Sequence, residues 1–111
     1  MIGFNQQNLA ISVQFQSEVT DTDLEQIDWP AHLEQLRLWG PKISDPSLER
    51  LRDLDHLKSL HLERTAITDA GLAHLGSLPK LEELNLNRTN ISGAGLVHLK
   101  RLPRLRQLRL V

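Results

Sequence analysis

Residues 57–80 read LKSLHLERTAITDAGLAHLGSLPK, and this 24-residue pattern recurs on both sides of the stretch. Seven apolar columns keep the same step. The first consists of Leu33, Leu57, Leu81 and Leu105, and the others begin at Leu36, Leu38, Ile43, Leu48, Leu51 and Leu54. One unit cannot bury its own leucines, so such repeats stack and share one core. The pattern therefore predicts a repeat architecture that folds cooperatively.

Each unit divides into a short strand and a short helix. Leu60 and Leu62 alternate with polar residues, which predicts a strand. Leu72 and Leu75 are three residues apart, as on one face of a helix, and Pro79 ends the helical stretch.

The helices have recognisable start signals. Thr68 and Asp69 are residue types that favour a helix N-cap. In the preceding unit we expect Asp45 to be the cap and Pro46 the first helical residue.

These elements predict the shape of the stack. Strands that recur in one direction pair in parallel. Neighbouring strands lie about 4.8 Å apart and packed helices about 8–10 Å, so the stack must curve. The predicted fold class is α/β: a solenoid, or curved right-handed βα superhelix, with a parallel sheet on the concave face and short helices on the convex face.

The run Leu57-Lys58-Ser59-Leu60-His61-Leu62-Glu63-Arg64-Thr65-Ala66-Ile67 resembles the leucine-rich repeat, with Thr65 where the family usually has Asn or Cys. Residues 67–72 are similar to the short-helix bacterial members and the ribonuclease-inhibitor-like group. The resemblance covers about residues 33–111. It implies a protein-interaction role. A threonine hydroxyl can bond one backbone group, whereas an amide satisfies two.

We expect one domain over residues 1–111. Residues 1–32 form a degenerate repeat, 33–56, 57–80 and 81–104 are full repeats, and 105–111 begin a further one. Upstream the register slips, so that Val13 and Phe15 take the strand positions, which implies a one-residue deletion between Phe15 and Val19. Residues 1–4 are expected to pair back along this strand as a hairpin through residues 5–8.

Alternation in the strands identifies the side chains that face a partner. The candidate partner-binding residues are Arg37, Trp39, His61, Glu63, Arg64, Asn85, Asn87, Arg88 and Arg109. Trp39 differs from its equivalents Glu63 and Asn87. It either lies over the loop of its own repeat or anchors an interface, where Trp and Arg dominate the binding energy. Trp29 is expected in the core or the cap.

No residue pattern points to catalysis, a cofactor or a metal. The chain has no cysteine, which excludes disulfides and thiolate sites. His32 and His56 are register-mates, as are His74 and His98, but two histidines without a third ligand make a poor zinc site. No Ser-His-Asp order or glycine-rich phosphate loop is present, and we predict that the chain is not an enzyme.

Charge is balanced overall but divided along the chain. Six acids and no Lys or Arg precede Arg37, and five bases but no acids lie from Lys100 onward. The two ends are either solvated or make weak head-to-tail contacts between copies. No aromatic residue interleaves with the basic end, which argues against nucleic acid.

The predicted function is a non-enzymatic protein–protein interaction module with a protein partner of unknown identity. A structural or assembly role through an uncapped C-terminal end, a substrate-recognition arm of a larger enzyme or effector, and a drifted array with no function of its own are the alternatives. The first 30 residues hold no Lys or Arg and no long apolar run, which predicts a cytoplasmic protein without a membrane anchor.

Overall fold

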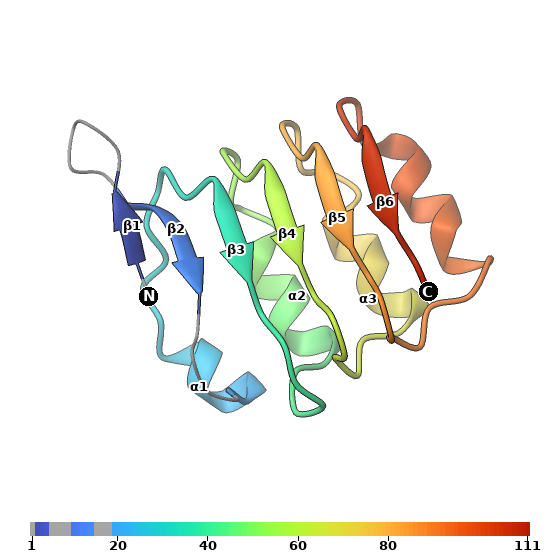
Figure 1. The fold of residues 1–111 in the computed structure, drawn as a ribbon, viewed down its shortest axis with the longest axis horizontal. Coiled ribbons are helices and arrows are strands. Elements are labelled where there is room, and N and C mark those ends of the chain that lie inside the picture. The colour runs from blue at the N-terminus through green and yellow to red at the C-terminus, as the bar shows by residue number, and fades with distance from the viewer. Residues whose placement is uncertain (1, 5–9, 15–18) are drawn as a thin grey trace.

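The strands form one sheet in chain order, in a computed structural model that describes residues 2–4, 10–14 and 19–111. They are β1 (Ile2–Phe4), β2 (Ala10–Gln14), β3 (Gln35–Arg37), β4 (Ser59–His61), β5 (Glu83–Asn85) and β6 (Gln107–Arg109). β2 to β6 pair in parallel, and β1 pairs antiparallel with β2. Figure 1 shows the strands in a row, with helices behind them.

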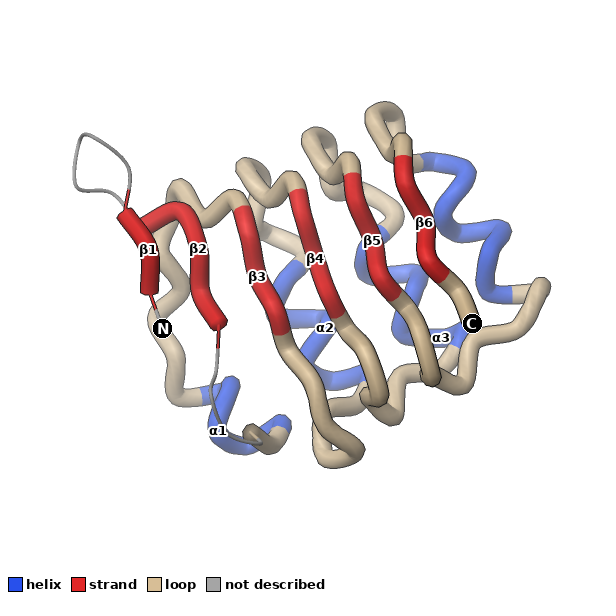
Figure 2. Tube along the Cα trace, in the orientation of Figure 1, coloured by secondary structure: helices blue, strands red, loops and turns tan. Residues whose placement is uncertain are grey.

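Short helical segments connect the strands on one side of the sheet (Figure 2). They are α1 (Asp21–Glu25), α2 (Asp45–Leu51), α3 (Asp69–Leu72) with its 3₁₀ continuation η1 (Ala73–Leu75), and the 3₁₀ segment η2 (Gly95–Arg101). Among the described residues, no helix has the length and apolar character to cross a membrane. The parallel sheet and helices confirm the predicted solenoid fold.

The leucine columns form one continuous core. Leu36, Leu60 and Leu84 are each at most 1% exposed, whereas their register-mate Leu108 is 39% exposed. Leu110 is also 39% exposed, because no further layer packs on β6 among the described residues. The core is therefore complete over the middle repeats and open at the β6 edge.

The N-terminal register follows the predicted slip. Val13 pairs with Leu36, so the strand position lies one residue later than a 24-residue step requires. Ile2 pairs with Val13 and Phe4 with Ala10 across a β-bulge, which confirms the predicted hairpin partner. Phe15, the inferred deletion before Val19 and the hairpin loop at residues 5–8 lie outside the described residues.

A ladder of three aspartates, Asp21, Asp45 and Asp69, ties consecutive repeats together on the helical side. Asp45 accepts hydrogen bonds from the amide and hydroxyl of Thr68 at 2.8 and 2.6 Å. Asp69 accepts the equivalent bonds from Ser92 at 2.7 and 2.5 Å. Asp21 accepts from the amide of Ser44 at 2.8 Å, and from the hydroxyls of Ser44 and Ser47.

This ladder changes the role of the predicted cap residues. Thr68 is the N-cap of α3, as predicted, yet it makes no side-chain capping bond, because its hydroxyl donates to Asp45. The predicted cap of α2 was wrong by one residue. Ser44 is the cap, and Asp45 is already helical. Asp45 does not bond its own helix start because its carboxylate is engaged by the next repeat.

The ladder also lowers two carboxyl pKa values. Burial raises the pKa of Asp21, but hydrogen bonds from Ser44 and Ser47 outweigh it, so the pKa lies below the ordinary 3.8. Hydrogen bonds from Ser92 lower the pKa of Asp69 in the same way. Both groups accept more strongly when ionised, so the ladder strengthens with ionisation.

Candidate functional site

Strand register brings the predicted concave-face residues into one column. Gln14 pairs with Arg37, Arg37 with His61, His61 with Asn85, and Asn85 with Arg109. These backbone pairs reproduce the column that the 24-residue step and the N-terminal slip predict. On β3, both Gln35 and Arg37 are exposed while Leu36 between them is buried, as alternation requires.

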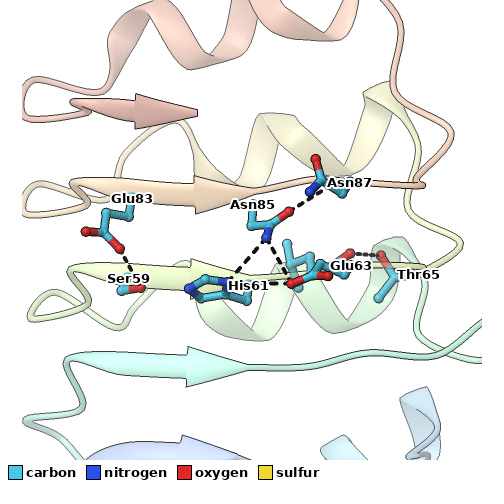
Figure 3. A network of polar contacts seen from close by, with 8 residues as sticks. Ser59, His61, Glu63, Thr65, Glu83, Asn85 and Asn87 are labelled. Atoms are coloured by element: carbon cyan, nitrogen blue, oxygen red, sulfur yellow. Dashed lines mark hydrogen bonds and ion pairs between the residues drawn. The ribbon is translucent and has the colours of Figure 1, made fainter. Parts of the chain in front are cut away.

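A polar network joins β4 to β5 at the centre of this column (Figure 3). The Asn85 amide donates to Oε1 of Glu63 at 2.9 Å and lies 3.5 Å from Nδ1 of His61. Its carbonyl accepts from the backbone amide of Asn87 at 3.0 Å. His61 Nδ1 is 3.8 Å from Glu63. Asn85 is only 4% exposed, so it holds Glu63 and His61 in place and presents little surface of its own.

His61 is held in its neutral form. Partial burial lowers its pKa below the ordinary 6.5, and the guanidinium of Arg37 lowers it further, with a smaller effect from Arg109. Glu63 and Glu83 act in the opposite direction without reversing the shift. Near neutral pH the centre of the column therefore carries an uncharged imidazole between two arginines.

Arg64 and Arg88 occupy a turn position that L-residues seldom adopt. Their φ values are 60° and 59°, and the equivalent residue in the preceding repeat is Gly40, with φ 118°. The backbone amide of Arg64 donates to the carbonyl of Asn87 at 3.0 Å, and that of Arg88 to Val111 at 2.9 Å. Cross-repeat hydrogen bonds thus continue past the strands and hold these arginines at the point where the chain turns.

Four of the nine candidate residues line a single depression. It has a volume of about 250 Å³, and its walls are Arg37, Leu38, Trp39, Glu63 and Arg64. Trp39 is 39% exposed. We call this depression the arginine–tryptophan cavity.

The remaining candidates lie outside the cavity. His61, Asn85 and Arg109 line a smaller depression of about 20 Å³. Asn87 belongs to the polar network, and Arg88 is exposed at its own turn. Glu83 and Gln107 also line the smaller depression. Strand alternation places both on the same face, although they are not among the nine candidate residues.

The threonines at the family's Asn position each make one backbone bond. Thr65, which is 3% exposed, donates to the carbonyl of Leu62 at 2.8 Å, and Thr89 donates to that of Leu86 at 2.7 Å. Each threonine hydroxyl thus bonds one backbone carbonyl, as expected. Beside Thr65, the amide of Ala66 donates to the carbonyl of Ile43 at 2.7 Å, which links the two repeats through their backbones.

Trp29 and the histidine pair His32 and His56, which the sequence also singled out, contact the core or one another. Trp29 packs against the hydrophobic core, as predicted. The rings of His32 and His56 lie 4.9 Å apart, and Nζ of Lys80 is 3.4 Å from Nδ1 of His56. Within the described ranges, no cluster of three His, Cys, Asp or Glu residues has the arrangement of a metal site.

Comparison with known proteins agrees with this geometry. The family model described as leucine rich repeat matches residues 55–111. Among solved structures, the chain is similar to internalin C2 from Listeria monocytogenes str. 4b F2365, with 29% sequence identity and a TM-score of 0.62. The match covers 71% of this chain but only 32% of the internalin chain. The search of curated proteins gave no significant match. The chain belongs to the leucine-rich repeat family.

Proposed function

We propose that the chain is a non-enzymatic interaction module that binds a protein partner through its concave sheet face. Leucine-rich repeat domains generally mediate protein–protein interaction. The observation that carries the proposal here is the arginine–tryptophan cavity, where an exposed indole and two arginines meet on that face. Trp and Arg are the residues most often found at binding hot spots.

Rigidity supports the same proposal. The side chains of the face project from parallel strands whose core leucines are almost fully buried. Asn85 fixes Glu63 and His61 through side-chain bonds. A surface already ordered before binding loses little conformational entropy on association, so more of the contact energy contributes to affinity.

The test is binding of a partner captured from the host by the whole chain. Trp39→Ala should weaken its binding by about 30-fold or more, as expected of a hot-spot tryptophan. The matched control is Val97→Ala, because Val97 is 57% exposed in η2 on the helical side. Equal affinity of wild type and Trp39→Ala, with the fold intact, would contradict the proposal.

One specific observation favours an assembly role as a second candidate. Leu108 and Leu110 are each 39% exposed and Val111 is 92% exposed, so the β6 edge presents apolar surface. An open strand edge is a site at which another chain can add. Sedimentation velocity distinguishes this candidate, because a size that rises with concentration supports assembly and a constant monomer contradicts it.

The cytoplasmic location and the role as a recognition arm of a larger enzyme or effector stay predictions. Both concern the setting in which the module works. Neither changes the surface through which we propose that it binds.

A further inference from the structure

The arginine–tryptophan cavity contains two guanidinium groups that have no carboxylate partner among residues 19–111. The ion pairs among residues 19–111 involve Arg50, Lys58 and Arg106, and none involves Arg37 or Arg64. The side-chain hydrogen bonds within the same residues also leave both guanidinium groups unused. Arginine forks of this kind match a carboxylate with two parallel hydrogen bonds.

Among the described residues of the cavity wall, the one acid is Glu63, and it already has hydrogen-bond partners outside the cavity. Glu63 accepts from the Asn85 amide at 2.9 Å, and its Oε1 lies 3.8 Å from His61. Figure 3 shows Glu63 together with His61 and Asn85 in this network. Glu63 keeps its charge in this network, but one carboxylate offsets only one of the two guanidinium groups, Arg37 and Arg64, in the cavity wall. The cavity therefore keeps a net positive charge.

The concave sheet face around the cavity also carries a net positive charge. Four arginines, Arg37, Arg64, Arg88 and Arg109, are exposed along it, and the acids of its strand columns are Glu63 and Glu83. Glu83 is within 3.4 Å of the Ser59 hydroxyl. This positive face contrasts with a whole chain whose formal charge is −1. A positive patch on a nearly neutral protein attracts acidic partners selectively.

The size of the cavity limits what it can hold. Small-molecule sites usually span roughly 300–1,000 Å³, whereas this cavity has about 250 Å³. It suits one or two side chains better than a cofactor. Trp39 adds an apolar wall that an aliphatic or aromatic side chain can cover.

We propose that the arginine–tryptophan cavity binds the carboxylate of an Asp or Glu in a partner segment, between Arg37 and Arg64, while an apolar neighbour packs on Trp39. The proposal rests on the proposed function and specifies its partner as an acidic peptide segment. RNA would satisfy the arginines equally well. It is disfavoured by the two glutamates on the face and by the presence of only one exposed aromatic side chain, Trp39, among residues 19–111.

The experiment selects peptides from a random library displayed on phage, using the whole chain as bait. We expect enriched peptides to carry Asp or Glu beside an apolar residue. A labelled peptide from this set should bind about tenfold more weakly to Arg37→Glu and Arg64→Glu, as for loss of a close charge pair. The control Arg104→Glu makes the same charge change at an exposed turn outside the cavity and should leave the affinity unchanged.

Exchanging the charges of the peptide acid and the arginine tests their direct contact more specifically than removing the arginine charge alone. Replacing the peptide's acid with Lys should weaken binding to wild type and restore binding to Arg64→Glu. If Arg64→Glu disturbs the turn, Arg64→Gly removes the guanidinium at a position whose equivalent in the preceding repeat, Gly40, also has a positive φ. Raising NaCl from about 0.05 to about 0.5 M should also weaken wild-type binding by screening the pair.

The outcomes separate this inference from the proposed function. Peptides that require Trp39 but lack any acid would overturn the acidic preference and leave the interaction face standing. Failure to select any Trp39-dependent peptide would count against both. Binding of a polyuridine oligonucleotide that is lost in Arg37→Glu, with no acidic peptide selected, would overturn the peptide assignment.

Discussion

Gly71 is the position where one added methyl group tests the aspartate ladder most sharply. A Cβ at Gly71 would lie 2.8 Å from Cγ of Asp45 and 3.0 Å from Cδ1 of Leu48. The Asp45 carboxylate accepts both the amide and the hydroxyl of Thr68, so it cannot move aside without losing those bonds. Gly71→Ala should therefore push the carboxylate out of the ladder and destabilise the fold.

The expected magnitude comes from opposing effects. Two lost hydrogen bonds cost about 1 kcal/mol each, and Ala gains about 1 kcal/mol over Gly inside a helix. Displacement of Leu48 adds strain. The net loss in the free energy of unfolding should be about 1–2 kcal/mol, or a melting temperature lower by about 4–8 °C.

Two further variants show whether the contact is the cause. The equivalent residue in the preceding repeat is Ser47, whose hydroxyl donates to Asp21. Gly71→Ser should therefore be less damaging than Gly71→Ala, although Ser is the poorer helix former. In an Asp45→Ala background the contact with the carboxylate is absent and only the contact with Leu48 is left, so Gly71→Ala should destabilise the chain clearly less there than in the wild type.

Urea denaturation followed by circular dichroism measures these free energies. Gly93→Ala is the control, because a Cβ there meets nothing within 4 Å; it should change stability by less than about 0.5 kcal/mol. The reasoning is refuted if Gly71→Ala has the same effect with and without Asp45, since the two sites would then be uncoupled.

Three other predictions follow from the core, the threonine bonds and the polar network. Leu60→Ala should cost about 2–5 kcal/mol in denaturant titrations, and Leu108→Ala clearly less, because Leu60 is 0% and Leu108 39% exposed; equal losses would contradict a core that is open at β6. Thr65→Val should cost about 1–3 kcal/mol by leaving the Leu62 carbonyl unpaired, and an unchanged melting temperature would show that this bond is dispensable. The folded pKa of His61 lies below 6.5, so the unfolded chain binds more protons and stability should fall as pH drops below 6.5. His61→Gln should flatten this slope between about pH 7 and about pH 5, whereas an unaltered slope would assign it to other groups.

Much of the fold was predictable because the leucine period carries both register and burial. The pairing of Leu36 with Leu60, and of Leu60 with Leu84, follows directly from the 24-residue step. The slip at Val13 was also visible, since the apolar positions shift by one. Core patterning was decisive here because a one-residue error in register would expose every strand leucine.

The cap of α2 was less predictable, because two neighbouring residues compete for one role. Ser44 and Asp45 are both good cap residues, so local preference does not separate them. The hydrogen bonds that Asp45 accepts from Thr68 in the next repeat engage its carboxylate, so Ser44 becomes the cap. The aspartates Asp21, Asp45 and Asp69 do recur at the 24-residue step. The residues that bond to Asp45 and Asp69 lie 23 residues further on, so the repeat step marks the aspartate column but not its hydrogen-bond partners.

The candidate site was predictable as a face but not as a cavity. Alternation along each strand identified which side chains point away from the core, and the strand register placed these side chains in columns. Whether Glu63 turns toward the arginines or toward Asn85 depends on side-chain packing that spacing does not encode. The same packing buries Asn85 to 4% and separates it from the exposed residues of its column.

Mapping the bound partner onto the chain by NMR tests the central claim most directly. The chemical shifts of this chain's backbone amides would be compared between the free chain and its complex with the captured partner. We predict shifts concentrated in β3 and β4 and in the turns that carry Trp39 and Arg64. Shifts confined to α2, α3 and η2, or to the open edge of β6, would contradict recognition through the concave face.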